Sequence, residues 1–236
     1  MRAKFSIISI VLILSILFMG SYTPVSALPG SNWATGIKLQ NLSSDTDATN
    51  VTIKLYDKDG TLASTISTTS SGLPLTIAKS SSVEVYLPNY SSVTSDQYSA
   101  EISSNVPLGV VATMTNYEYG IADSYNSMEP ALEVSVPYVY HNHNFWATEI
   151  YIQNTTGASV TGKVYLTEPA GGASSSDGLG DKEVDFSILP YGTYSLNTSD
   201  SAYDSLGWFI GAARITASGK VAVVSNQLRI VGAGAV

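Results

Sequence analysis

The chain of 236 residues contains no cysteine and only two histidines. Without cysteine it can form no disulfide, no thiolate nucleophile and no Cys-type zinc site. The two histidines, His141 and His143, are separated by a single residue and lack an obvious partner acid or nucleophile in sequence. No glycine-rich phosphate loop is present, because Gly171-Gly172 is not followed by a lysine that opens a helix. We therefore expect a protein that is not an enzyme.

Charge is also scarce. Only 13% of the residues are charged, and the formal net charge is −8. An acidic chain is a poor partner for nucleic-acid phosphates and for anionic lipid surfaces. The surface must instead be built from Ser, Thr, Asn, Gly and Tyr, a composition typical of exported proteins.

Only the N-terminus carries a long apolar run. Two positive charges within residues 1–4 precede an almost unbroken apolar stretch over residues 5–19, and Val25-Ser26-Ala27 forms a small-x-small site. This pattern is typical of a secretory signal peptide at residues 1–27, cleaved after Ala27. An uncleaved anchor is the less favoured alternative, because about 20 apolar residues are needed to span a membrane. We expect a secreted protein at the cell surface, with no membrane contact after cleavage.

One phrase occurs twice in the chain. WATGIKLQN (Trp33–Asn41) returns as WATEIYIQN (Trp146–Asn154), an offset of 146 − 33 = 113 residues, and residues 100–113 resemble residues 213–226 at the same offset. A period of this length fits a whole domain rather than a solenoid repeat. The sequence therefore predicts a tandem duplication, with one domain over residues 28–126 and the second over residues 127–236.

Each copy shows the alternation of a half-buried strand. In the repeated phrase, every second residue forms one face, and that face carries the large apolar side chains. The core-facing sets are Trp33, Thr35, Ile37 and Leu39 in the first copy and Trp146, Thr148, Ile150 and Ile152 in the second. Several short strands separated by turn signals predict an all-β protein of two tandem β-sandwich domains with immunoglobulin-like topology. A jelly-roll is the alternative.

The two copies differ at their beginnings. Residues 131–145 alternate and predict a first strand for the second domain, whereas the first domain retains only residues 28–32 before Trp33 after cleavage. The first domain therefore has one strand fewer, or another segment completes it. One candidate is the apolar C-terminus, residues 227–236, added to a neighbouring chain as a strand. Its candidate residues are Gln227, Leu228, Ile230 and Val231. The favoured alternative is that this segment is the last strand of its own domain.

Metal ligands are few. His141 and His143 could share a metal if both lie on one strand face, but a solvated junction between the domains is the favoured interpretation. Oxygen-rich loops can bind calcium outside cells, and the candidates are the pairs Asp45/Asp47 and Asp57/Asp59, with Asp200/Asp204 as a further pair. Asp57-Lys58-Asp59-Gly60 is more simply a hairpin turn. We expect no cofactor other than calcium.

Asparagine and tyrosine give two further kinds of candidate. Asn-x-Ser/Thr acceptors for glycosylation occur at Asn41, Asn50, Asn89, Asn154 and Asn197. Asn41 and Asn154 occupy equivalent positions of the repeat, so they alternatively cap the turn that follows each strand. The chain has 15 tyrosines, and exposed tyrosines either stack on sugars and partner subunits or pair across strands.

These motifs resemble a known kind of module. Residues 33–41 with 146–154, 51–56 with 160–165, and 103–112 are similar to the immunoglobulin-like β-sandwich modules of secreted and cell-surface bacterial proteins, Chloroflexi-like ones especially. The resemblance implies fold and export, and a role as a spacer, adhesive domain or subunit of a surface assembly. We accordingly expect a structural or adhesive protein, as a subunit of a fibre or sheath whose partners are copies of itself or other surface proteins. The alternative is a carbohydrate-binding module whose partners are glycans.

Overall fold

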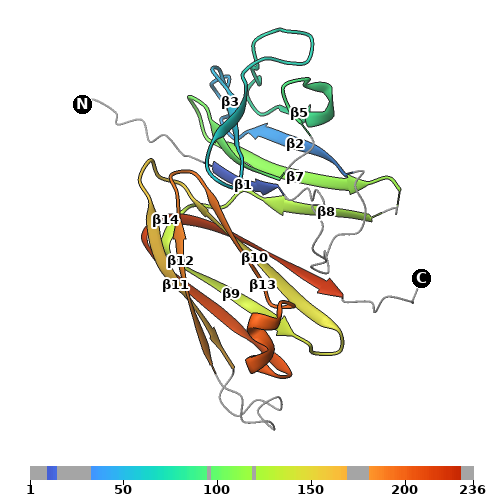
Figure 1. Cartoon of the computed structure of the whole chain (residues 1–236). Helices are drawn as coiled ribbons and strands as arrows, with labels where there is room; N and C mark the ends of the chain where they lie inside the picture. Colours follow the sequence, from blue (N-terminus) through green and yellow to red (C-terminus); the bar gives the residue numbers. More distant parts are fainter. Residues whose placement is uncertain (1–9, 15–32, 95–96, 119–120, 169–180, 230–236) are drawn as a thin grey trace. The chain divides into compact units, whose positions relative to one another are not determined.

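The computed structural model describes residues 10–14, 33–94, 97–118, 121–168 and 181–229 (Figure 1). These residues form an all-β protein that divides into two compact units. Among the described residues, unit 1 holds residues 10–14 and 33–130, and unit 2 begins at Ala131. The division therefore falls after Pro130, where the sequence predicted it after Asn126. No helix in the described part of the chain has the length and hydropathy that a membrane span requires.

Unit 1 consists of two antiparallel sheets, with strand orders β1-β6-β3-β4 and β5-β2-β7-β8. A short 3-10 helix, η1 (Leu87–Asn89), follows β5. The strands are β1 (Ile10–Leu14), β2 (Trp33–Asn41), β3 (Thr52–Tyr56), β4 (Leu62–Ile66), β5 (Ser82–Tyr86), β6 (Tyr98–Ser103), β7 (Leu108–Asn116) and β8 (Ile121–Asn126).

Unit 2 is built on one very long strand. β14 pairs with β11 and β9 along its first half and with β10 along its second half, so the order is β12-β11-β14-β10-β13 with β9 beside β14. A 3-10 helix, η3 (Ser201–Leu206), precedes β14. The strands are β9 (Ala131–His141), β10 (Trp146–Asn154), β11 (Val160–Thr167), β12 (Lys182–Ile188), β13 (Thr193–Asn197) and β14 (Phe209–Arg229).

The two units share one pairing scheme. In unit 1, β2 lies between β5 and β7, and β3 lies between β4 and β6. In unit 2, β10 lies between β13 and the second half of β14, and β11 lies between β12 and the first half of β14. The repeated phrase forms β2 and β10 with the predicted bounds, Trp33–Asn41 and Trp146–Asn154. The sequence correspondence between the halves is therefore also a correspondence of strands.

The units differ in the connection between β6 and β7. Unit 1 breaks the chain between them at residues 104–107, which end in Pro107, whereas unit 2 continues as strand through the equivalent residues 217–220. Proline lacks the backbone N–H that a sheet ladder needs. Lys220 stands in place of Pro107, and the β9–β14 pairing shows a register shift between Thr216 and Val221 beside these residues.

Each unit has its own apolar core. In β2, Ile37 and Leu39 are fully buried and Trp33 is 8% exposed, as the alternation predicted. In β10, Ile150 and Ile152 are fully buried, but Trp146 is 37% exposed, so its predicted place in the core is wrong. Trp146 is the first residue of its strand and directly follows a turn, residues 142–145, which places it at the end of the sheet.

A glycine and an aromatic ring pack together in unit 2. Gly162 on β11 stands opposite Phe186 on β12. A Cβ atom on Gly162 would lie 2.4 Å from Cζ of Phe186 and 2.2 Å from the carbonyl oxygen of Thr216. The ring therefore fills the space that a side chain at position 162 would need.

Candidate functional site

The outer edge of β6 is the first candidate site. β1 pairs with β6 antiparallel, and Ile10 lies opposite Ile102 while Leu12 lies opposite Ala100. β1 belongs to the stretch that the sequence predicts to be a signal peptide; the rest of residues 1–27 lies outside the described residues. The sequence predicted that unit 1 either has one strand fewer than unit 2 or is completed by another segment. In the structure, the N-terminal apolar segment itself completes this sheet.

The equivalent edge of unit 2 carries β9. Val134 lies opposite Ile215 and Val136 opposite Ala213. Since Ile215 and Ala213 are the counterparts of Ile102 and Ala100 at the offset of 113, β9 and β1 occupy the same position in their units. Val136 is 5% exposed and belongs to the core of unit 2. A strand at this edge is thus part of the fold rather than an addition to it.

The C-terminal segment is partly committed to unit 2. Gln227 pairs with Thr148, Leu228 with Ala147, and Arg229 with Trp146. The Gln227 amide also accepts a hydrogen bond from Thr148 Oγ1 at 2.8 Å and donates one to the Tyr138 carbonyl oxygen at 2.9 Å. Up to Arg229 the segment is therefore the last strand of its own unit. The other two candidate residues, Ile230 and Val231, lie outside the described residues.

The calcium candidates hold turns together. Asp57 Oδ1 accepts hydrogen bonds from the backbone N–H of Asp59 at 3.0 Å and of Thr61 at 2.9 Å, and Gly60 adopts φ 87°. This is the hairpin turn between β3 and β4. Asp47 Oδ1 accepts from the N–H of Lys79 at 2.9 Å, and Asp45 accepts from Ser44 Oγ. Within the described residues, no group of three or more acidic or histidine side chains is placed to hold a metal ion.

Asn41 and Asn154 make equivalent buried contacts. The Asn41 side-chain amide donates to the carbonyl oxygens of Thr46 at 2.8 Å and Ile77 at 3.1 Å. The Asn154 amide donates to those of Ala158 at 2.7 Å and Leu189 at 3.0 Å. Both residues are at most 1% exposed. Their amide nitrogens fasten the loop after each strand, which favours the structural interpretation of these two positions over a glycan acceptor in the folded protein.

The remaining sequons lie in different surroundings. Asn50 and Asn89 are exposed, and Asn50 adopts φ 56°. Asn197 is half-buried and donates a hydrogen bond to Glu149 Oε1 at 3.1 Å, and its Oδ1 accepts one from the Ser199 N–H at 2.9 Å. Asn50 and Asn89 are therefore the candidates that a transferase could reach most readily.

Glu149 is a buried carboxyl in unit 2. Burial raises its pKa, and the charge of Asp200 acts in the same direction, while hydrogen bonds from Tyr151 and Asn197 act against both. The Tyr151 hydroxyl donates to Glu149 Oε2 at 2.8 Å. In unit 1 the aligned residue is Gly36, which carries no side chain. This carboxyl is therefore specific to the second copy, and the sequence did not mark it.

The two histidines do not share a strand face. His141 ends β9, is fully buried, and bonds the Thr198 carbonyl oxygen through Nδ1 and Asn142 Nδ2 through Nε2, at 3.0 Å for the latter. Both of its ring nitrogens are thus used within the fold, and the predicted solvated junction is wrong for this residue. His143 lies in the following turn, where Nε2 contacts Asn144 Nδ2 at 3.0 Å. The spacing of the two histidines in the sequence does not reveal that β9 ends at His141 and that His143 lies in the turn.

An exposed aromatic surface surrounds this turn, and we call it the aromatic end of unit 2. The ring of His143 lies 6.1 Å from that of Trp208 and 6.4 Å from that of Tyr140, measured between centroids. Phe145 and Trp208 are 68% and 62% exposed. Phe145 also adopts φ 67°, which large side chains rarely do. Sequence reasoning looked only at tyrosines, and missed these two residues.

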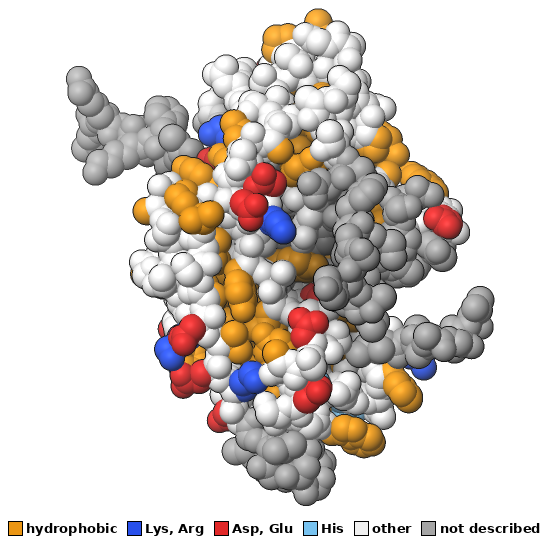
Figure 2. All heavy atoms as spheres, viewed as in Figure 1, with side chains coloured by type: hydrophobic (Ala, Val, Ile, Leu, Met, Phe, Trp, Pro, Cys, Tyr) orange, Lys and Arg blue, Asp and Glu red, His pale blue; other side chains and the backbone are white. Residues whose placement is uncertain are grey.

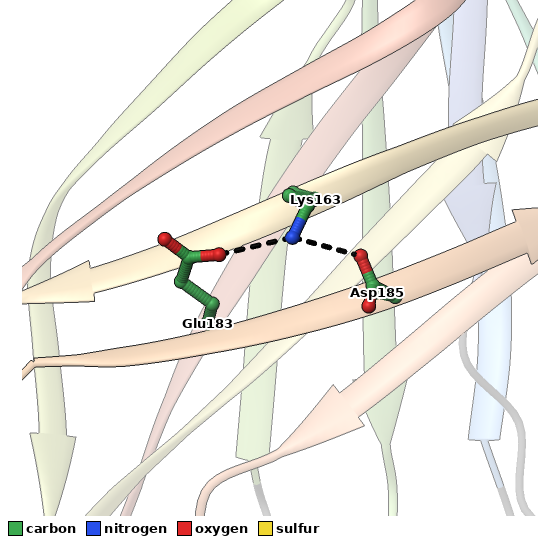
Figure 3. Close-up of polar contacts among 3 residues, drawn as sticks. All are labelled: Lys163, Glu183 and Asp185. Carbon is green, nitrogen blue, oxygen red and sulfur yellow. Dashed lines mark hydrogen bonds and ion pairs between the residues drawn. The ribbon is translucent and has the colours of Figure 1, made fainter.

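Charged side chains are scattered and partly neutralise one another. In Figure 2, the acidic and basic side chains on the face drawn are scattered among hydrophobic side chains and the atoms of the backbone and other side chains. Lys163 on β11 lies 3.0 Å from Glu183 and 3.3 Å from Asp185, both on β12 (Figure 3). These carboxylates raise the pKa of the lysine. Lys163 is therefore an internally paired cation.

Comparison with known proteins gave no match to a protein family model, to a curated protein or to a solved structure.

Proposed function

We propose that this chain is an extracellular, non-enzymatic structural or adhesive protein of two tandem β-sandwich domains, whose copies join by strand addition. Unit 1 and unit 2 are the two domains, and removal of residues 1–27 during export opens the outer edge of β6. The supporting observation is the β1–β6 pairing, because the strand that completes unit 1 comes from the segment expected to be lost.

An open edge of this kind favours association. β6 would present one row of unpaired backbone N–H and C=O groups, and such a row is a template for another strand. Its core-facing residues Ala100 and Ile102 are fully buried with β1 in place, and losing the covering strand exposes apolar surface beside them. An interface between two different surfaces of successive copies generates a ring if its rotation closes and a filament if it does not.

The test is the state of the secreted protein. The full chain is expressed in a secreting host, its N-terminus is sequenced, and the product is followed by sedimentation velocity and negative-stain electron microscopy. We expect an N-terminus at Leu28 and multimers or filaments that grow with concentration. A processed protein that stays monomeric at the highest attainable concentration contradicts the assembly proposal.

A second candidate function is carbohydrate binding at the aromatic end of unit 2. Exposed aromatic rings stack on sugars. Phe145 and Trp208 are 68% and 62% exposed, and the Trp208 ring lies 6.1 Å from that of His143. Glycan-array binding by the secreted protein should be lost in Trp208→Ala. The matched control is Tyr117→Ala in unit 1, where the tyrosine is 70% exposed. Equal binding by both variants would refute this role.

A further inference from the structure

We propose that the strand which fills the β6 edge of the processed protein is the C-terminal tail of a second copy, with Val231 opposite Ile102 and Ala233 opposite Ala100. This inference rests on the proposed function and names the donor and its register. The acceptor is defined by two independent pairings of the same geometry, β1 with β6 and β9 with β14. Both are antiparallel, and both set an apolar residue opposite the isoleucine and another opposite the alanine two positions away.

The retained N-terminus cannot fill this edge. In unit 2, four residues, 142–145, connect the end of β9 at His141 to Trp146 at the start of β10. After cleavage at Ala27, only the five residues 28–32 precede the equivalent Trp33. A connection of the same length would leave one residue for a strand that is five residues long in β1. Pro29 would also remove a backbone donor.

The edge requires a particular kind of segment. An antiparallel donor of about five residues must carry apolar side chains at alternate positions, since the side-chain period in a strand is two. In unit 2 those positions are Val134 and Val136. The partner strand on the other side of β6 is β3, with Ile53 opposite Ile102 and Leu55 opposite Ala100, and all four side chains are fully buried. A charged residue at either donor position would be placed against this core.

The tail that follows Arg229 meets these requirements. Residues 230–236 read IVGAGAV, with no charge and no proline. In a donated strand, Val231, Ala233 and Ala235 would share one face, and Gly232 and Gly234 would occupy the other. In the register of β1, Val231 takes the place of Ile10, Ala233 that of Leu12, and Ala235 that of Leu14, opposite Tyr98. A small donor residue is then placed opposite the largest side chain of β6.

Cysteine cross-linking tests the register directly, because the natural chain has no cysteine. Gly232 would lie opposite Glu101 on the outward face, at a Cβ separation close to what a disulfide needs. Two single-cysteine full chains, Glu101→Cys and Gly232→Cys, are co-secreted under mild oxidation, and linked peptides are identified by mass spectrometry. Any 101–232 disulfide then joins two different chains.

The control moves the cysteine by one position. In the proposed register, the cysteine of Ala233→Cys would face the core, away from the cysteine of Glu101→Cys, because a one-residue shift reverses the strand face. We therefore expect the yield of the 101–233 disulfide to be lower than that of the 101–232 disulfide by about tenfold or more. Glu101 contacts Tyr56 and Lys54. If the loss of Glu101 unfolds unit 1, the pair Ser99→Cys and Gly234→Cys tests the same register.

A third chain tests whether the tail pairs within its own chain. It carries both Glu101→Cys and Gly232→Cys and is oxidised as a dilute monomer.

The outcomes separate the two proposals. Multimers with a dominant 101–232 link support the inference. Multimers without that link, or with equal linking of the control, overturn the donor assignment and leave strand-mediated assembly standing. An intramolecular link in the dilute double variant shows that the tail closes its own chain and overturns the second-copy assignment. Protein that never multimerises overturns both proposals.

Discussion

The two units share a pairing scheme and differ in how they complete it. Unit 2 has its edge strand, β9, in the interior of the chain, so cleavage after Ala27 would not remove it. Unit 1 is completed by β1, from the segment predicted to be cleaved. Under the proposed cleavage, the same sheet edge keeps its outer strand in unit 2 and loses it in unit 1. The assembly proposal rests on that difference.

The largest expected difference concerns one pair of equivalent isoleucines. Ile215→Ala in unit 2 should cost about 2–5 kcal/mol of unfolding free energy, because it leaves a cavity in a closed core. Ile102→Ala in unit 1 should cost less in the processed monomer, since no strand covers the outer edge of β6. Chemical denaturation followed by hydrogen exchange in each unit measures both losses. Equal losses would show that the two edges are alike.

The glycine opposite Phe186 should be nearly as sensitive. Gly162→Ala places a Cβ atom 2.2 Å from a backbone carbonyl oxygen, and overpacking of this kind costs about 1–3 kcal/mol. Gly109→Ala in unit 1 is the matched control, because its Cβ would make only ordinary contacts, with Leu42 at 3.4 Å and Gln40 at 3.9 Å. Thermal unfolding should shift for the first variant and hardly at all for the second. A similar shift in both variants would contradict the described packing.

The repeated asparagines should behave alike in the two units. Asn41→Ala and Asn154→Ala each remove two buried side-chain hydrogen bonds that hold the following loop, at a cost of about 1–3 kcal/mol. Urea denaturation of the secreted variants checks this expectation. A large loss at one position and none at the other would mean that the two loops are not equivalent.

The smallest expected effect depends on pH. Because burial raises the pKa of Glu149 in the folded protein, the folded state holds this proton more tightly than the unfolded chain. The contribution of Glu149 to the free energy of unfolding therefore falls as the pH rises from the ordinary pKa of this carboxyl, near 4.5, through its higher pKa in the folded protein. Glu149→Gln should flatten this decline and be slightly more stable at neutral pH. Denaturation midpoints measured across this range would contradict the account if the variant lost stability more steeply than the natural protein.

Local patterns predicted the strands well. The alternation of Trp33–Asn41 and Trp146–Asn154 predicted β2 and β10 to the residue, because period-2 patterning reflects burial of one face. The same alternation failed for Trp146, since a pattern does not tell where the sheet ends. The sequence shows that unit 2 has no proline at the position of Pro107. It does not show the consequence, which is that β14 continues as one strand, because this depends on backbone pairing.

The candidate sites were harder to predict. A histidine's burial depends on residues distant in sequence, and His141 contacts Thr198, 57 positions away. Phe145 and Trp208 lie in separate loops and follow no period, so only the fold brings them to one end of unit 2. The pairing of β1 could not be read from the sequence either, because an apolar segment of that kind is equally a signal peptide and a buried strand.

Hydrogen exchange at the two equivalent edges tests the central claim most directly. The secreted protein is diluted until sedimentation shows monomers, and backbone amide exchange is followed in β6 and in the first half of β14. We expect fast exchange at the outer-edge amides of β6 and strong protection of the equivalent amides of β14 beside β9. Concentrating the protein into multimers should protect β6. Amides of β6 that are already as protected in the monomer as those of β14 would contradict an open edge.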